Sequence, residues 1–233
     1  MKQQKTLIQY FEWYLPEDAA HWRRASSDAE HLAALGYTSI WLPPAYKGAG
    51  GIKDVGYGVY DLYDLGEFDQ KGSIPTKYGT KEEYLNAIHT LQGAGLEVLG
   101  DMVLNHRMGA DRREAVMAER CLETDREQGS GVEERIMAWT RFTFPGRSGR
   151  YSGFHWNHTH FNGVDWDDQE KKSHIWRLNG KEWEDEVDQE NGNFDYLMGA
   201  NLDMANPDVI AELDRWGLWY LQTTGLDGFR LDA

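Results

Sequence analysis

The 233-residue sequence lacks several common features, and each absence excludes a class of protein. Its single cysteine, Cys121, can form no internal disulfide, and there is no Cys-x-x-Cys motif for zinc or redox chemistry. No stretch approaches the roughly 18 consecutive apolar residues that a membrane-spanning helix needs. The apolar run at 6–11 is too short for the core of a signal peptide, so we expect a cytoplasmic protein without a membrane partner.

Positive charge is also scarce. The chain has 24 Lys and Arg against 39 Asp and Glu, which gives a net charge of -15. Such a field repels phosphate backbones, so nucleic acid is not an expected partner, and a neutral or cationic substrate is favoured. Aromatic residues, in contrast, are abundant, with 10 Trp, 12 Tyr and 8 Phe. Many of them must form the core, but Trp and Tyr also stack well on sugar rings.

Strand and helix patterns alternate along most of the chain. The expected strands are residues 7–11, 37–42, 96–104 and 227–232. Capping boxes at 27–30 and 80–83 predict the starts of two helices, which should end at Gly36 and at Gly93 or Gly95. A third helix should begin after Asn206, where Pro207 follows the cap, and end near Gly225. This alternation predicts an α/β fold with a parallel sheet, either an open doubly wound sheet or a (β/α) barrel.

The alternation stops between Arg107 and Asn206, where Gly, Asn, Asp, Trp and His predominate. Helical periodicity appears there only at 112–120. Ordinary connections have about 2–8 residues, so this stretch is expected to be an inserted domain. The predicted organisation is a first part at 1–106, an insertion at 107–206 and a continuation at 207–233. Four strands make only half of a barrel that needs eight.

Polar side chains stand at the ends of two predicted strands. Arg230 and Asp232 share one face of the last strand, because side chains alternate across a sheet. The neighbouring guanidinium favours an ionised Asp232, which could act as a nucleophile or an electrostatic stabiliser. Asp101 and His106 close the third strand at the same sheet end, where parallel folds keep their active sites. A structural salt bridge and ordinary turn chemistry are the alternative interpretations.

Two of these strand ends carry longer motifs. Asp101-Met-Val-Leu-Asn-His106 and Gly228-Phe-Arg-Leu-Asp-Ala233 resemble the first two signature regions of the alpha-amylase family of glycoside hydrolases. Four more segments resemble the bacterial liquefying-type members: residues 9–14, 56–66, 77–81 and 191–198. The six matches occur in order along nearly the whole chain.

This resemblance implies the N-terminal half of a (β/α)8 TIM barrel, strands one to four, with an irregular, β-rich domain B inserted after the third strand. It also implies endo-acting, retaining hydrolysis of α-1,4-glucans by two carboxylates. Asp232 matches the nucleophile and Arg230 its partner. The residues that match substrate-binding positions are Asp101, His106, Tyr57, Trp13 and Gln9.

The resemblance further implies Ca2+ as a cofactor, bound by oxygen ligands. Asn105, Asp195 and Asn201 match the ligand positions of one site. Relatives with several ions would place acids at 162, 201 and 205, where this sequence has Asn162, Asn201 and Ala205. Fewer carboxylates attract divalent ions more weakly. We therefore expect one calcium of modest affinity, no second calcium, and no sodium ion between two calciums.

Three histidines of the insertion, His155, His158 and His160, lie close together in the sequence. In an extended strand only His158 and His160 would share a face, and no acidic zinc-type spacing accompanies them. Surface or interdomain histidines are therefore favoured over a transition-metal site.

The family's general acid and third carboxylate would lie beyond Ala233. The 233 residues alone are therefore expected to be inactive, and to expose the apolar edge of an unclosed sheet. Two other functions remain open: a non-catalytic, truncated glucan-binding remnant, and a glucanotransferase of the same family.

Overall fold

The computed structural model describes residues 5–232, which fall into two compact units. The first unit contains the chain up to Leu104, the segment Pro145–Tyr151 and the chain from Arg215 onward. The second contains Asn105–Phe144 and Ser152–Asp214. Compared with the insertion predicted at 107–206, the second unit begins at Asn105, leaves out Pro145–Tyr151 and continues to Asp214.

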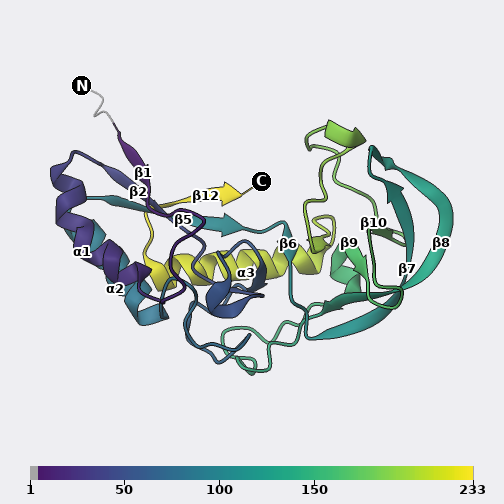
Figure 1. Cartoon of the computed structure of the whole chain (residues 1–233), viewed down its shortest axis with the longest axis horizontal. Helices are drawn as coiled ribbons and strands as arrows, with labels where there is room; N and C mark the ends of the chain where they lie inside the picture. Colours follow the sequence, from purple (N-terminus) through teal and green to yellow (C-terminus); the bar gives the residue numbers. More distant parts are fainter. Residues whose placement is uncertain (1–4, 233) are drawn as a thin grey trace. The chain divides into compact units, whose positions relative to one another are not determined.

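The first unit is built on a four-stranded parallel sheet with the order β1-β2-β5-β12 (Figure 1). Its strands are β1 (Leu7–Gln9), β2 (Ser39–Leu42), β5 (Glu97–Val103) and β12 (Gly228–Asp232). All four lie within or close to the predicted runs, and their order and direction are those of an unclosed part of a barrel. A short antiparallel pair, β3 (Lys47–Gly48) and β4 (Val59–Asp61), and the 3-10 turn η1 (Gly51–Lys53) lie between β2 and the second helix in the chain.

Strand register decides which side chains share a face of this sheet. Gln9 pairs with Trp41, Trp41 with Leu99, and Arg230 with Asp101. Paired residues point the same way, and every second residue returns to the same face. Gln9, Trp41, Asp101 and Arg230 therefore lie on one face.

The helices are α1 (His21–Ala34), α2 (Lys81–Gly93) and α3 (Pro207–Thr224). The capping box at Thr80 is confirmed, since its side chain accepts from the backbone of Glu83 while the Glu83 side chain accepts from the backbone of Thr80. The cap at Asn206 is also confirmed, because its side-chain oxygen accepts from the Asp208 N–H at 3.0 Å.

The start predicted for α1 at Ser27 is wrong. The helix begins at His21, and the Ser27 hydroxyl donates to the carbonyl of Arg23 in the helix interior. The buried residues of α1 include Trp22, Ala25, Ala29 and Leu32, which recur at helical spacing. Burial of this stripe extends the helix by two turns before the predicted cap, although Ala20 at its start offers no capping side chain.

Aromatic side chains join the helices of the first unit. The Trp22 and Tyr84 rings lie 4.7 Å apart, and the hydroxyls of Tyr84 and Tyr220 share a hydrogen bond of 2.8 Å. Trp216 stacks on Tyr220 and donates its indole N–H to the Leu62 carbonyl at 2.9 Å.

The second unit is a six-stranded antiparallel sheet with the order β6-β11-β9-β10-β7-β8. Its strands are β6 (His106–Arg107), β7 (Arg112–Leu122), β8 (Asp125–Arg141), β9 (Phe161–Asp167), β10 (Lys172–Leu178) and β11 (Ala200–Leu202). The β7–β8 hairpin is the long teal pair in Figure 1. Two 3-10 turns, η2 (His158–His160) and η3 (Glu190–Gly192), complete the unit.

One local prediction in the second unit is wrong. The helical period at 112–120 belongs to strand β7, in which Val116 and Ala118 are buried on one face while the residue between them is exposed. Ala, Glu, Arg and Met favour helices, but pairing with β8 overrides that weak preference. His158 and His160 lie in a 3-10 turn and not in an extended strand. No helix of the described chain is long and apolar enough to cross a membrane.

Candidate active site

A hollow of about 510 Å³ lies in the first unit at the carboxyl end of the parallel strands. Its lining residues are Gln9, Phe11, Glu12, Trp13, Trp41, Tyr57, Arg230 and Asp232. Five of them, Gln9, Trp13, Tyr57, Arg230 and Asp232, are site residues that the sequence predicts. The folded first unit therefore gathers these residues around one cavity.

Arg230 and Asp232 are in direct contact at the end of β12. The Arg230 guanidinium donates to Asp232 Oδ1 at 2.5 Å and to Asp101 Oδ1 at 3.1 Å. The side chains of Arg230 and Asp232 keep 36% and 19% of their exposure, so this ion pair borders the hollow and is not sealed in the core. Burial lowers the pKa of Arg230, but its bond to Asp232 and the charge of Asp101 outweigh burial and raise it. The guanidinium is thus a permanent positive charge beside Asp232.

Asp101 accepts hydrogen bonds from residues that line the hollow. Its side chain is fully buried and accepts hydrogen bonds from Tyr57 Oη at 2.9 Å, Trp41 Nε1 at 3.1 Å and Arg230. Burial raises the pKa of Asp101, and the three donors oppose that effect. Because the Asp101 oxygens already accept hydrogen bonds from these three donors, Asp101 holds the donor side chains in place in this structure.

Two aromatic rings form the wall of the hollow. Trp13 and Tyr57 are stacked, with centroids 6.0 Å apart and planes 11° from parallel. Trp13 is 59% exposed, so its ring is accessible to a ligand. Burial, followed by the charge of Asp101, raises the pKa of Tyr57, and its hydroxyl therefore stays protonated as a donor.

The loop that carries Tyr57 is fixed by Asp54. The Asp54 carboxylate accepts from the backbone N–H groups of Gly56 at 2.9 Å and Gly58 at 3.2 Å. A Cβ at Gly58 would lie 2.5 Å from an Asp54 oxygen, so only glycine allows this close approach. The backbone on either side of Tyr57 is therefore fixed by Asp54.

Sequence reasoning missed Trp41, Phe11 and Glu12. Trp41 is the residue before the end of β2, so the parity argument used for β12 could have found it. Glu12 accepts from the Tyr14 N–H at 2.6 Å and thereby shapes the turn that carries Trp13. Gln9 donates to the Phe11 carbonyl at 3.1 Å on the same edge.

The remaining predicted residues belong to the second unit. His106 lies on β6, where it pairs with Asn201 of β11, and is 2% exposed. Asp195 Oδ2 accepts from Asn162 Nδ2 at 2.8 Å, and Asn162 Oδ1 accepts from Asn201 Nδ2 at 2.9 Å. Asp195 and Asn201 are thus linked through Asn162.

Two asparagines at β6 and β11 carry buried amide oxygens of the kind that hard cations bind. Both polar side-chain atoms of Asn105, together with Asn201 Oδ1, are buried and have no hydrogen-bond partner in the described chain. Buried oxygens without donors are unusual in proteins, and they are the ligands that Ca2+ prefers. Within residues 5–232, no three His, Cys, Asp or Glu side chains are arranged to hold a metal, so any ligand set must draw on amide or backbone oxygens.

Two of the three histidines of the insertion, His158 and His160, have structural contacts. His158 Nδ1 lies 3.4 Å from Glu114 Oε1. His160 accepts from the Asn157 N–H at 3.1 Å and packs edge-on against Trp156. The His158 ring thus lies beside a carboxylate, and the His160 ring takes part in capping and packing within the second unit.

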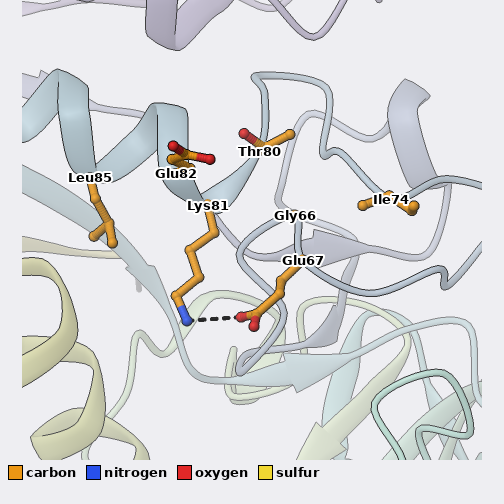
Figure 2. Close-up of a pocket in the computed structure, with 7 residues that line it drawn as sticks. All are labelled: Gly66, Glu67, Ile74, Thr80, Lys81, Glu82 and Leu85. Carbon is orange, nitrogen blue, oxygen red and sulfur yellow. Dashed lines mark hydrogen bonds and ion pairs between the residues drawn. The ribbon is translucent and has the colours of Figure 1, made fainter.

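A second hollow in the first unit, of about 440 Å³, is lined by Gly66, Glu67, Ile74, Thr80, Lys81, Glu82 and Leu85 (Figure 2). Lys81 Nζ donates to Glu67 at 2.8 Å and to the Tyr151 hydroxyl at 2.7 Å. Lys81, Glu67 and the Tyr151 hydroxyl are therefore bonded to one another beside this hollow, and none of the predicted site residues lines it.

Comparison with known proteins identifies the family. The family model described as the alpha-amylase catalytic domain matches residues 22–233. The chain belongs to the alpha-amylase family. It is 54% identical to an alpha-amylase of Geobacillus stearothermophilus, over 98% of this chain and 42% of that relative. It is 47% identical to a cytoplasmic alpha-amylase of Escherichia coli, over 98% of this chain and 47% of the relative.

A solved structure supports the fold. The alpha-amylase of Geobacillus thermoleovorans, crystallised with acarbose, matches 97% of this chain and 37% of its own with a TM-score of 0.51 and 18% identity. The expected α/β class and partial barrel are confirmed. The chain spans less than half the length of the curated relatives described above.

Proposed function

We propose that this chain carries the nucleophile half of an α-1,4-glucan hydrolase that acts within starch, glycogen or maltodextrin chains and retains anomeric configuration. The observation that carries the proposal is the Arg230–Asp232 pair, which borders a hollow walled by the stacked rings of Trp13 and Tyr57. Membership of the alpha-amylase family supports the reaction class.

In this proposal each group has a separate task. Asp232 attacks the anomeric carbon and forms a covalent glycosyl intermediate, which water then hydrolyses. Arg230 donates a hydrogen bond to the Asp232 carboxylate and fixes its orientation. Trp13 and Tyr57 bind glucose rings by stacking, which suits a neutral substrate in a chain of net charge -15.

The mechanism needs a second carboxylic acid that protonates the leaving oxygen. In retaining enzymes the two carboxyl groups lie about 5–5.5 Å apart. Asp101 is tied to three donors, and Glu12 to the backbone of Tyr14, so neither is assigned this task. We assign the acid to a Glu outside these 233 residues, and we expect the 233-residue chain to bind glucan without cleaving it.

The experiment uses the longest protein that the reading frame through the Ala233 codon encodes, with maltoheptaose as substrate. We expect the first product detected by NMR to be the α-anomer, and Asp232→Asn to abolish turnover while maltoheptaose still binds. Asp227→Asn is the matched control, because Asp227 precedes the same strand at its other end and accepts from the Val98 N–H. Loss of turnover in both variants, or in neither, would refute the assignment of Asp232.

The same assay separates two alternatives. If the frame stops after Ala233 and the chain binds maltoheptaose without cleaving it, the protein is a glucan-binding remnant. If labelled maltoheptaose gives longer oligosaccharides faster than it gives hydrolysis products, the protein is a glucanotransferase.

We also propose one Ca2+ of modest affinity, held by Asn105, Asp195 and Asn201. The unpartnered oxygens of Asn105 and Asn201 support it. Asp203, which matches an acid position of the multi-ion cluster in relatives, is paired with Lys181, and this pairing argues against a second calcium. Calorimetric titration of chelator-treated protein should give one binding event; two tight calcium sites would contradict the proposal.

A cytoplasmic location is proposed on the similarity to the cytoplasmic alpha-amylase of Escherichia coli. Fractionation of cells that express the protein from its own gene tests it: we expect the protein in the cytoplasmic fraction. Its appearance in the culture medium would refute the proposal.

A further inference from the structure

Trp41 contacts both charged groups behind the proposed nucleophile. Its indole N–H donates to Asp101 Oδ2 at 3.1 Å, and the Arg230 guanidinium carbon lies 4.9 Å from the centre of its ring. The Phe11 ring meets Trp41 edge-on at 5.2 Å and supports it from the neighbouring chain segment. Trp41 therefore restrains the Asp101 carboxylate through its indole N–H and the Arg230 guanidinium through the face of its ring.

The sheet makes this arrangement rigid. Trp41 pairs with Leu99 on β5, and Asp101 is the next residue of β5 on the same face. Arg230 on β12 pairs directly with Asp101 on β5. The three side chains thus project from three adjacent strands of one ladder, and none of them depends on a loop for its position.

We propose that Trp41 is a positioning residue for the reaction: it holds Asp101 and Arg230 so that the guanidinium stays directed at Asp232. This inference rests on the proposed function for the role of Asp232. The contact that it names lies entirely within the first unit and exists whatever the substrate is.

A purely packing role predicts something different. Packing needs only an aromatic ring, so Trp41→Phe would be tolerated. In the positioning role the N–H matters, because without it Asp101 keeps only Tyr57 and Arg230 as donors. Arg230 is then drawn toward Asp101 and away from Asp232. Charge stabilisation counts most in the transition state, so kcat should fall more than KM rises.

The first test is spectroscopic and needs no substrate. The indole N–H resonance of Trp41 is assigned in 15N spectra by its disappearance in Trp41→Phe. A hydrogen bond to a carboxylate is stronger than one to an amide, so Asp101→Asn should move this resonance upfield. A Trp41 resonance that does not move in Asp101→Asn would overturn the proposal.

The second test is kinetic and uses the protein and substrate described above. Loss of a hydrogen bond to a charged group predicts a fall in kcat of about 10- to 100-fold for Trp41→Phe, with KM changed less than about threefold. Trp216→Phe is the matched control, since it removes an indole N–H that donates to the Leu62 carbonyl away from this site. It should lower thermal stability and leave kcat unchanged.

An equal fall in kcat for Trp41→Phe and Trp216→Phe would overturn the positioning role. If the unmodified protein turns over no glucan, the proposed function fails. The resonance test still decides whether Trp41 holds Asp101, so the two failures are distinguishable.

Discussion

Replacing Arg147 with Met should destabilise the first unit more than any exposed charge replacement. Arg147 Nε donates to Asp61 Oδ2 at 2.9 Å, and both side chains are 1% exposed. Asp61 also accepts from Gln70 Nε2 at 2.9 Å and from the Tyr63 N–H at 3.1 Å. Without Arg147, the carboxylate would remain buried with neutral donors alone.

The size of the effect follows from that burial. Breaking one partner of a buried ion pair costs about 3–5 kcal/mol, because the remaining charge is uncompensated. Arg150→Met is the matched control: Arg150 pairs with Glu67 at 3.2 Å, but its side chain is 62% exposed. An exposed pair contributes about 0–1 kcal/mol, so the two variants should differ clearly.

The pH dependence provides a second check on the same variant. Burial is the main cause that raises the pKa of Asp61, and the charge of Arg147 opposes it. An acid with a raised native pKa binds protons more readily in the folded state, so its destabilising effect grows as pH rises. The deficit of Arg147→Met should therefore be greatest near pH 7, shrink as the pH falls toward the ordinary Asp value of about 4, and be smallest below it.

The assay is urea unfolding, followed by circular dichroism, at pH 7 and below about pH 4. Adding Asp61→Asn to Arg147→Met should recover at least about 1 kcal/mol, because the buried group is then uncharged. A loss below about 1 kcal/mol for Arg147→Met, or a loss equal to that of Arg150→Met, would refute the reasoning.

Two further predictions concern the helices. Thr80→Ala should lower the free energy of unfolding by about 1 kcal/mol, because Thr80 caps α2, whereas Ser27→Ala should change it by less than about 0.5 kcal/mol; urea unfolding of both variants measures the difference, and equal losses would contradict the cap assignment. Burial lowers the pKa of His21 to about 4. The unfolded state then binds the extra proton below the usual value of 6.5, so stability should fall by about 3 kcal/mol as pH drops from 7 to 4. His21→Gln should remove that part of the pH dependence, and an unchanged slope would refute it.

The sequence by itself determined the features that depend on neighbours in the chain. The caps at Thr80 and Asn206 were predictable because a capping side chain bonds to backbone two or three residues away. The shared face of Arg230 and Asp232 was predictable because side-chain direction alternates along any strand. Tyr57 and Trp13 were assigned to the site by family resemblance alone, since their spacing carries no local signal.

Only the tertiary structure decided features that depend on distant partners. Strand β7 has helix-favouring residues, yet its pairing with β8 makes it a strand. Helix α1 starts at His21 because burial of Trp22 outweighs the cap at Ser27. The contact between Trp41 and Asp101 joins residues 60 positions apart through the register of β2 and β5. Such pairings gain their free energy from long-range packing, which neither local propensity nor periodicity records.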